Sequence, residues 1–202
     1  IPRKSFANSK LTARLKSFLG LLHITDLKED IDQAKKSFLE NKPININECI
    51  KTHLKNEILN QLKINLDPNK FEVFLTKLLY KLGATTVTIP AKNNKNNALN
   101  NIGDVDVVAI FEKLKHIIYI QAKFHNEVSG KWALEQLNDY KDSDKEEEGY
   151  TQAFWAITTA DTFSQDAIDF SNSEKTKNIR LMTGLELAEL ILDVGIEGFQ
   201  DY

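Results

Sequence analysis

Two apolar segments separated by only four residues constrain this chain more than any other feature of its sequence. Residues 105–111 and 116–124 are rich in valine, isoleucine, alanine and phenylalanine, and residues 112–115 connect them. Segments of this length and composition, joined by so short a connection, predict two antiparallel strands in a hairpin. With the connection at the turn, Phe111 faces His116 in the predicted register.

This register brings polar residues together at the open end of the predicted hairpin. Asp106 lies opposite Gln121, and Asp104 lies opposite Lys123. Because side chains alternate between the two faces of a strand, the two aspartates share one face, as do Gln121 and Lys123. Burying such groups without partners is costly, so they must pair, bind a ligand or lie at an exposed end of the sheet.

The same residues suit phosphodiester hydrolysis assisted by Mg²⁺. This ion prefers oxygen ligands, usually one or two carboxylates together with water and a substrate phosphate. Asp106 and the amide oxygen of Gln121 can supply two ligands, and the backbone carbonyl of Ala122 can add a third. Lys123 then places an ammonium beside the attacking water or the scissile phosphate.

Helices and further strands are predicted around this hairpin. A helix begins with Asp67 as its N-cap and Pro68 in its first turn, and it ends at Gly83. Further strands are predicted at residues 84–89, 153–159 and 179–182, and further helices at residues 132–140, 162–170 and 184–192. This order predicts an α/β fold with a mixed central sheet flanked by helices. Trp132 and Trp155 are expected in its core, and the alternative is that they are platforms on which nucleic-acid bases stack.

Three motifs carry a resemblance to a known family. They are Phe71-Glu72 with Leu78-Leu79 and Gly83, then Gly103-Asp104-Val105-Asp106-Val107, then Tyr119-Ile120-Gln121-Ala122-Lys123. In this order they resemble the Mrr-type restriction endonuclease domain of the PD-(D/E)xK nuclease superfamily, over roughly residues 66–193. That family commonly has glutamine in the place of the second acidic residue. The resemblance implies a restriction-endonuclease-like fold, a core site of Asp106, Gln121 and Lys123, and Glu72 as a helper.

The function implied by the resemblance is metal-dependent cleavage of double-stranded DNA. We expect a Mg²⁺-dependent endonuclease, in which Mn²⁺ can substitute, as the nuclease part of a restriction or host-defence system. Two alternatives stay open, a structure-specific nuclease similar to junction resolvases, and a catalytically inactive nuclease fold that binds DNA or assembles with other proteins. A homodimer is expected because cleaving both strands commonly requires two active sites, and an additional recognition domain or subunit is a further expected partner.

Residues 1–66 are predicted to form a small helical accessory subdomain, with residues 67–202 as the endonuclease domain. The third helix predicted within residues 1–66 has Ile58 and Leu62 on its buried side. Residues 1–67 hold 12 Lys+Arg and 8 Asp+Glu, a net charge of +4, whereas residues 68–202 hold 14 and 21, a net charge of −7. Contacts to DNA phosphates are therefore expected from the N-terminal part, where cations are densest between Arg3 and Lys16, or from another region.

The surroundings of the protein are also limited by its sequence. No apolar run approaches the ~18 residues of a membrane-spanning helix, and no signal-peptide pattern opens the chain. Cys49 is the only cysteine, which excludes an internal disulfide framework and fits a location in the reducing cytoplasm. The chain begins with Ile1 rather than methionine, so we expect it to be a piece of a longer polypeptide.

Four residues keep alternative interpretations. Gln121 is either a metal ligand or a structural hydrogen-bond partner. Asp104 is either catalytic, a turn cap, or a partner of Lys123. His125 is either a phosphate contact or an ordinary histidine at a strand end. Glu72 is either the helper carboxylate or a solvated residue beside the apolar face of its helix.

Overall fold

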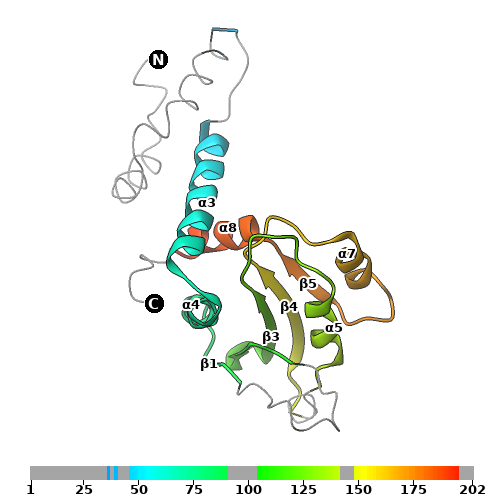
Figure 1. The fold of residues 1–202 in the computed structure, drawn as a ribbon. Coiled ribbons are helices and arrows are strands. Elements are labelled where there is room, and N and C mark those ends of the chain that lie inside the picture. The colour runs from blue at the N-terminus through cyan, green and yellow to red at the C-terminus, as the bar shows by residue number, and fades with distance from the viewer. Residues whose placement is uncertain (1–35, 37–38, 41–45, 91–103, 142–147, 196–202) are drawn as a thin grey trace. The chain divides into compact units, whose positions relative to one another are not determined.

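Figure 1 shows the chain in a computed structural model, which describes residues 36, 39–40, 46–90, 104–141 and 148–195. By contacts the chain divides into two compact units, Ile1–His53 and Leu54–Tyr202, and each is considered by itself. The first predicted helix and the cations between Arg3 and Lys16 lie outside the described residues. The second predicted helix is described only at residues 36 and 39.

Helix α3 (Ile46–Asn65) is the third helix predicted for the N-terminal part. Its second half belongs to the second unit, because Ile58, Leu59 and Leu62 are buried in a core that also contains residues of the sheet. The contact boundary therefore falls between residues 53 and 54, inside this helix. The proposed division into residues 1–66 and 67–202 stays a prediction.

Strands and helices follow one another in the predicted order. The strands are β1 (Thr86–Thr88), β2 (Val107–Phe111), β3 (His116–Lys123), β4 (Thr151–Thr158) and β5 (Ile179–Met182). The helices are α4 (Pro68–Lys81), α5 (Trp132–Asp139), α7 (Gln165–Ser171) and α8 (Gly184–Val194), and a 3₁₀ turn, η2 (Glu112–Leu114), connects β2 to β3. In the described part of the chain, no helix has the length and apolar character needed to cross a membrane.

The five strands form one mixed sheet in the order β1-β2-β3-β4-β5. The pairs β1–β2 and β2–β3 are antiparallel, and the pairs β3–β4 and β4–β5 are parallel. The β2–β3 register runs from Phe111 opposite His116 to Val107 opposite Ile120, which confirms the predicted pairing. Parallel neighbours need a crossover connection, and α5 and α7 lie in the two connections.

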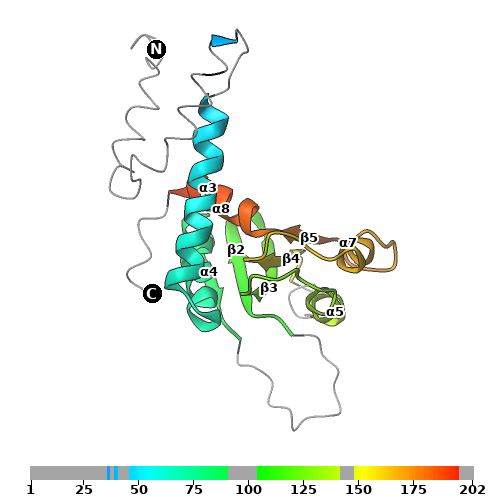
Figure 2. The same ribbon diagram turned by 45° about the horizontal axis from the view of Figure 1, so that its top comes forward.

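Helices cover both faces of this sheet, as predicted. Helix α4 contacts β1, β2 and β3, and α8 contacts β4, whereas α5 contacts β3, β4 and β5. Figures 1 and 2 show α4 on one side of the strands and α5 and α7 on the other. Strand β3 serves both layers because its side chains alternate, with Ile118 and Ile120 in one core cluster and Ile117 and Tyr119 in the other. Trp155 packs against the first cluster.

Helix α4 begins and ends as the sequence predicts. The side chain of Asp67 accepts a hydrogen bond from the N–H of Lys70 at 2.9 Å, and Pro68 occupies the first turn. Gly83 follows the helix with φ of +100°, a conformation that side chains rarely allow. These caps fix the ends of the helix whose apolar face covers the hairpin.

Helix α7 begins later than predicted, at Gln165 rather than Thr162. Phe163 forms a parallel bridge with Ser129, in the segment that follows β3. Ser164 then caps the helix, because its side chain accepts from the N–H of Ala167. Phe163 therefore pairs with the segment between β3 and α5 and does not belong to the helix.

Candidate functional site

The open end of the β2–β3 hairpin carries the polar residues that were predicted to meet. Asp106 directly precedes β2, and its backbone N–H donates to the carbonyl of Ile120 at 2.8 Å. Gln121 lies on β3 directly after the last pair of the ladder. Both side chains are buried, with exposed fractions of 7% for Asp106 and 3% for Gln121. Two hydrophilic side chains are thus removed from water at the open end of an apolar hairpin.

The carboxylate of Asp106 is held by two hydrogen bonds from β3. Its Oδ2 accepts from Nε2 of Gln121 at 2.6 Å and from the backbone N–H of Ala122 at 2.8 Å. Hydrogen bonds to an ionised carboxylate are roughly twice as strong as neutral ones. The carboxylate is therefore fixed in one orientation, with Gln121 in direct contact.

One buried atom of Gln121 has no hydrogen-bond partner among the described residues. Because Nε2 donates to Asp106, Oε1 must point elsewhere, and the flipped amide would set two oxygens against each other. Oε1 is buried and accepts no hydrogen bond from any residue that the structure describes. A buried acceptor without a partner costs about 1–3 kcal/mol. An unmatched oxygen beside a carboxylate is the kind of donor pair that a hard divalent cation prefers.

The donor set for such a cation would combine different kinds of oxygen. Among the described residues, no group of three or more His, Cys, Asp or Glu side chains is arranged to hold a metal ion. The set that fits consists of the Asp106 carboxylate, Oε1 of Gln121 and the backbone carbonyl of Ala122. The N–H and C=O of one strand residue point to the same side of the strand. Since the N–H of Ala122 reaches Asp106, its carbonyl faces that side as well.

Lys123 is the last residue of β3, and its ammonium lies over an aromatic ring. Its Nζ is 4.4 Å from the centroid of the Trp132 ring, at the first residue of α5. Trp132 is 61% exposed, so the expectation that it belongs to the core is wrong. Helix α5 turns Ala133, Leu134 and Leu137 towards the sheet instead, and position 132 falls beside this buried stripe.

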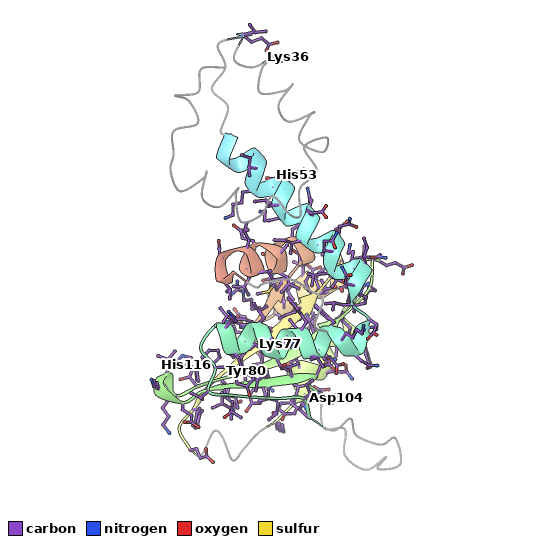
Figure 3. All side chains as sticks on the ribbon, turned by 90° about the vertical axis from the view of Figure 1, so that its left-hand side faces the viewer. Lys36, His53, Lys77, Tyr80, Asp104 and His116 are labelled. Carbon is purple, nitrogen blue, oxygen red and sulfur yellow. The ribbon has the colours of Figure 1, made fainter. Side chains whose placement is uncertain are left out.

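Two further acidic residues were singled out from the sequence. Glu72 lies on α4 and is only 8% exposed, so the alternative of a solvated residue is wrong. The neighbouring Phe71 contacts Phe124 with ring centroids 5.5 Å apart, which places the first turn of α4 near the end of β3. Asp104 is partly exposed and lies at the opposite end of the hairpin from His116 (Figure 3). Its role stays a prediction.

His125 follows β3 and is tied to a group of buried hydroxyls. Its Nε2 lies 2.9 Å from Oγ of Ser129, which in turn donates to Oγ1 of Thr158 at 2.7 Å. Oγ1 of Thr159 accepts from the backbone N–H of His125 and donates to its carbonyl, each at 2.9 Å. These contacts favour a structural role for His125 at the end of the strand.

Sequence reasoning missed this hydroxyl group and the contact of Trp132. Ser129, Thr158 and Thr159 are fully buried, although serine and threonine are mostly exposed in proteins. The available signal was a pair of threonines that ends an otherwise apolar strand. The partners of these threonines lie far away in the chain, at positions that local spacing does not identify.

The chain is similar to one family of nucleases by sequence. The family model of the Mrr catalytic domain, described as "Restriction endonuclease", matches residues 64–191. This range contains Glu72, Asp106, Gln121 and Lys123. No curated protein matches the chain.

Two solved structures resemble the chain at low sequence identity. One is the crystal structure of AF1548, a protein of unknown function, with 17% identity, a TM-score of 0.47, and coverage of 67% of this chain and 71% of that chain. The other is the MspJI restriction endonuclease in complex with a 27-mer oligonucleotide. It has 16% identity, a TM-score of 0.46, and coverage of 68% of this chain and 31% of that chain.

Proposed function

The chain belongs to the Mrr-type restriction endonuclease family, and from this premise we propose that it is a Mg²⁺-dependent endonuclease of double-stranded DNA. Family membership confirms the resemblance, and the mixed sheet with flanking helices is the α/β fold of a restriction endonuclease. The chain thus carries a nuclease domain of the restriction type. One observation carries the finer proposal, the buried unmatched Oε1 of Gln121 beside the carboxylate of Asp106.

We assign the metal to Asp106, Gln121 and Ala122. Glutamine in place of a carboxylate removes one negative charge, so the site holds a cation less by net charge and more by the placement of its oxygens. The hydrogen bonds from Gln121 and Ala122 to Asp106 both come from β3, which keeps the carboxylate and the amide in register before any ion arrives. When bound, Mg²⁺ supplies positive charge to the phosphate and makes water a stronger nucleophile at neutral pH.

We assign charge stabilisation at the scissile phosphate to Lys123. Its ammonium is on the same strand as Gln121, two residues further towards the strand end, so the two side chains share a face. A fixed charge in a partly dehydrated site acts more strongly on a developing anion than the same charge in water. Glu72 is the helper, a buried carboxylate on the helix that covers this part of the hairpin.

The direct test is incubation of supercoiled plasmid with the protein and Mg²⁺ or Mn²⁺, with and without EDTA. We expect nicked or linear DNA with metal, and unchanged plasmid with EDTA. Thermal unfolding with and without Mg²⁺ measures metal binding apart from cleavage. Plasmid that stays supercoiled under every condition, in a protein that Mg²⁺ stabilises, would instead favour an inactive DNA-binding module. A four-way junction offered beside linear duplex separates a junction-resolving nuclease from a duplex endonuclease.

A further inference from the structure

Trp132 is a large aromatic residue that the fold leaves in water beside Lys123. Its exposed fraction is 61%, although Ala133 and Leu134, which follow it on the same helix, are buried. Tryptophan is highly buried on average, so this exposed ring differs from the usual case. The ammonium of Lys123 lies over the face of this ring, 4.4 Å from the ring centroid. Tryptophan is the strongest of the aromatic side chains in such contacts with a cation.

The backbone on both sides of this contact is fixed by the sheet. The N–H of Thr159 donates to the carbonyl of Lys123 at 3.0 Å, which extends the β3–β4 pairing to the end of the strand. Between Lys123 and Trp132, the fully buried Ser129 hydrogen-bonds Thr158 through its hydroxyl at 2.7 Å. The end of β3 and the connection that leads to Trp132 are therefore both hydrogen-bonded to the end of β4.

A second lysine lies next to Trp132 in sequence and takes different partners. Nζ of Lys131 is 2.9 Å from the carboxylate of Glu135 and 5.6 Å from the ring centroid of Phe170. The hydrogen bond and the charge of Glu135 raise the pKa of Lys131. The ring of Trp132 thus engages the lysine of the candidate site, and Lys131 provides a natural control.

We propose that Trp132 is a positioning residue for Lys123. Lysine ends in a flexible four-carbon chain, and holding its ammonium at one place costs rotamer entropy. The indole ring restricts that chain before DNA binds, so the ammonium stays near the open end of the hairpin. The catalytic consequence rests on the proposed function of Lys123, whereas the contact itself does not.

The first test is spectroscopic and needs no cleavage. The chain has two tryptophans, so Trp155→Phe leaves Trp132 as the only tryptophan emitter. In that background, Lys123→Met removes the charge from the ring but keeps the length of the side chain. We expect a shift of the Trp132 emission maximum in Lys123→Met and no shift in Lys131→Met. Identical spectra for Lys123→Met and its parent, or equal shifts in both lysine variants, would overturn the proposal.

The second test is kinetic and compares two replacements of similar size. Trp132→Phe keeps an aromatic face, whereas Trp132→Leu keeps only the apolar surface. We expect kcat to fall about two- to fivefold in Trp132→Leu, with KM for DNA unchanged, and to be largely retained in Trp132→Phe. A change of KM alone, or equal losses in both variants, would make Trp132 a plain DNA or packing contact. If no form of the protein cleaves DNA, the proposed function fails, and the emission spectra still decide whether Trp132 holds Lys123.

Discussion

The two ends of the β2–β3 hairpin are made from the same strands but treat polar groups in opposite ways. At the turn end, the hydroxyl of Thr85 donates to the carbonyl of Ile110 at 2.8 Å and accepts from the N–H of Glu112 at 3.2 Å. His116 is exposed there, with Nδ1 2.6 Å from the carbonyl of Leu114. The polar groups of Thr85 and His116 thus have hydrogen-bond partners in the protein, and both residues are exposed.

At the open end, the polar groups are buried and their pairing is incomplete. Gln121 donates one hydrogen bond to Asp106, but Oε1 of Gln121 has no partner within the described part of the chain. Folding gains nothing from that oxygen, since an unmatched buried acceptor is a cost. The turn end is therefore completed by the chain's own groups, and the unmatched oxygen at the open end supports our proposal of a metal ligand there.

The largest effect is expected from Asp106→Asn, which keeps the shape of the side chain but removes its charge. We expect the rate of plasmid cleavage to fall by roughly three decades or more, because the only carboxylate of the assigned metal ligands is lost. His116→Asn at the turn end is the matched control and should cleave normally. Circular dichroism verifies that both variants fold, and an active, folded Asp106→Asn protein would remove the central assignment.

A smaller but still large loss is expected from Lys123→Met. Losing one preorganised charge at the phosphate should lower the rate by about two decades at saturating DNA and metal. Lys113→Met in the turn removes an exposed lysine from the same hairpin and should leave the rate unchanged. Equal rates in the wild type and Lys123→Met would mean that the lysine has a structural rather than a catalytic role.

A third change, Gln121→Glu, sharpens the comparison without removing the oxygen. A carboxylate at nearly the same reach should bind Mg²⁺ tighter, by up to about tenfold, and lower the melting temperature without metal because it repels Asp106. Gln136 on α5 also has a buried Oε1 without a partner among the described residues, so Gln136→Glu is the control and should leave metal affinity unchanged. Calorimetric titration with Mg²⁺ measures the metal affinity of both variants. A sharp drop in affinity for Gln121→Glu would show that Gln121 is not a metal ligand.

The smallest effect is expected at the turn end, from Thr85→Val. The isosteric change removes the hydrogen bonds of the Thr85 hydroxyl and should cost about 1 kcal/mol in the free energy of unfolding. Denaturant unfolding measures this loss, and metal affinity should stay as in the wild type. A change in Mg²⁺ binding would contradict the separation of the two ends.

The hairpin and its polar end were predictable because they depend on local rules. Apolar segments joined by four residues allow few registers, and the alternation of side chains then sets which residues share a face. The meeting of Asp106 and Gln121 follows from that register alone. The caps of α4 follow from Asp67, Pro68 and Gly83 for the same reason, since each acts within one turn of the chain.

What could not be predicted depends on contacts between distant segments. The burial of α3 residues such as Leu59 against the sheet requires the tertiary fold, so a boundary drawn from the break before Pro68 differs from the contact boundary. The exposure of Trp132 was missed because an apolar residue type does not tell which side of a short helix faces the core. The orientation of the Gln121 amide follows only from its hydrogen bond to Asp106.

The assigned metal ligands and Lys123 all lie in one hairpin, and this has a consequence for folding kinetics. Closing a short turn is fast, whereas the parallel pairing of β3 with β4 joins residues such as His116 and Thr151 across a helical crossover. We expect the open end to form early, while still hydrated, and to lose water when β4 and α4 dock. A cation that binds the early hairpin should then accelerate refolding as well as slow unfolding, which stopped-flow refolding with and without Mg²⁺ measures.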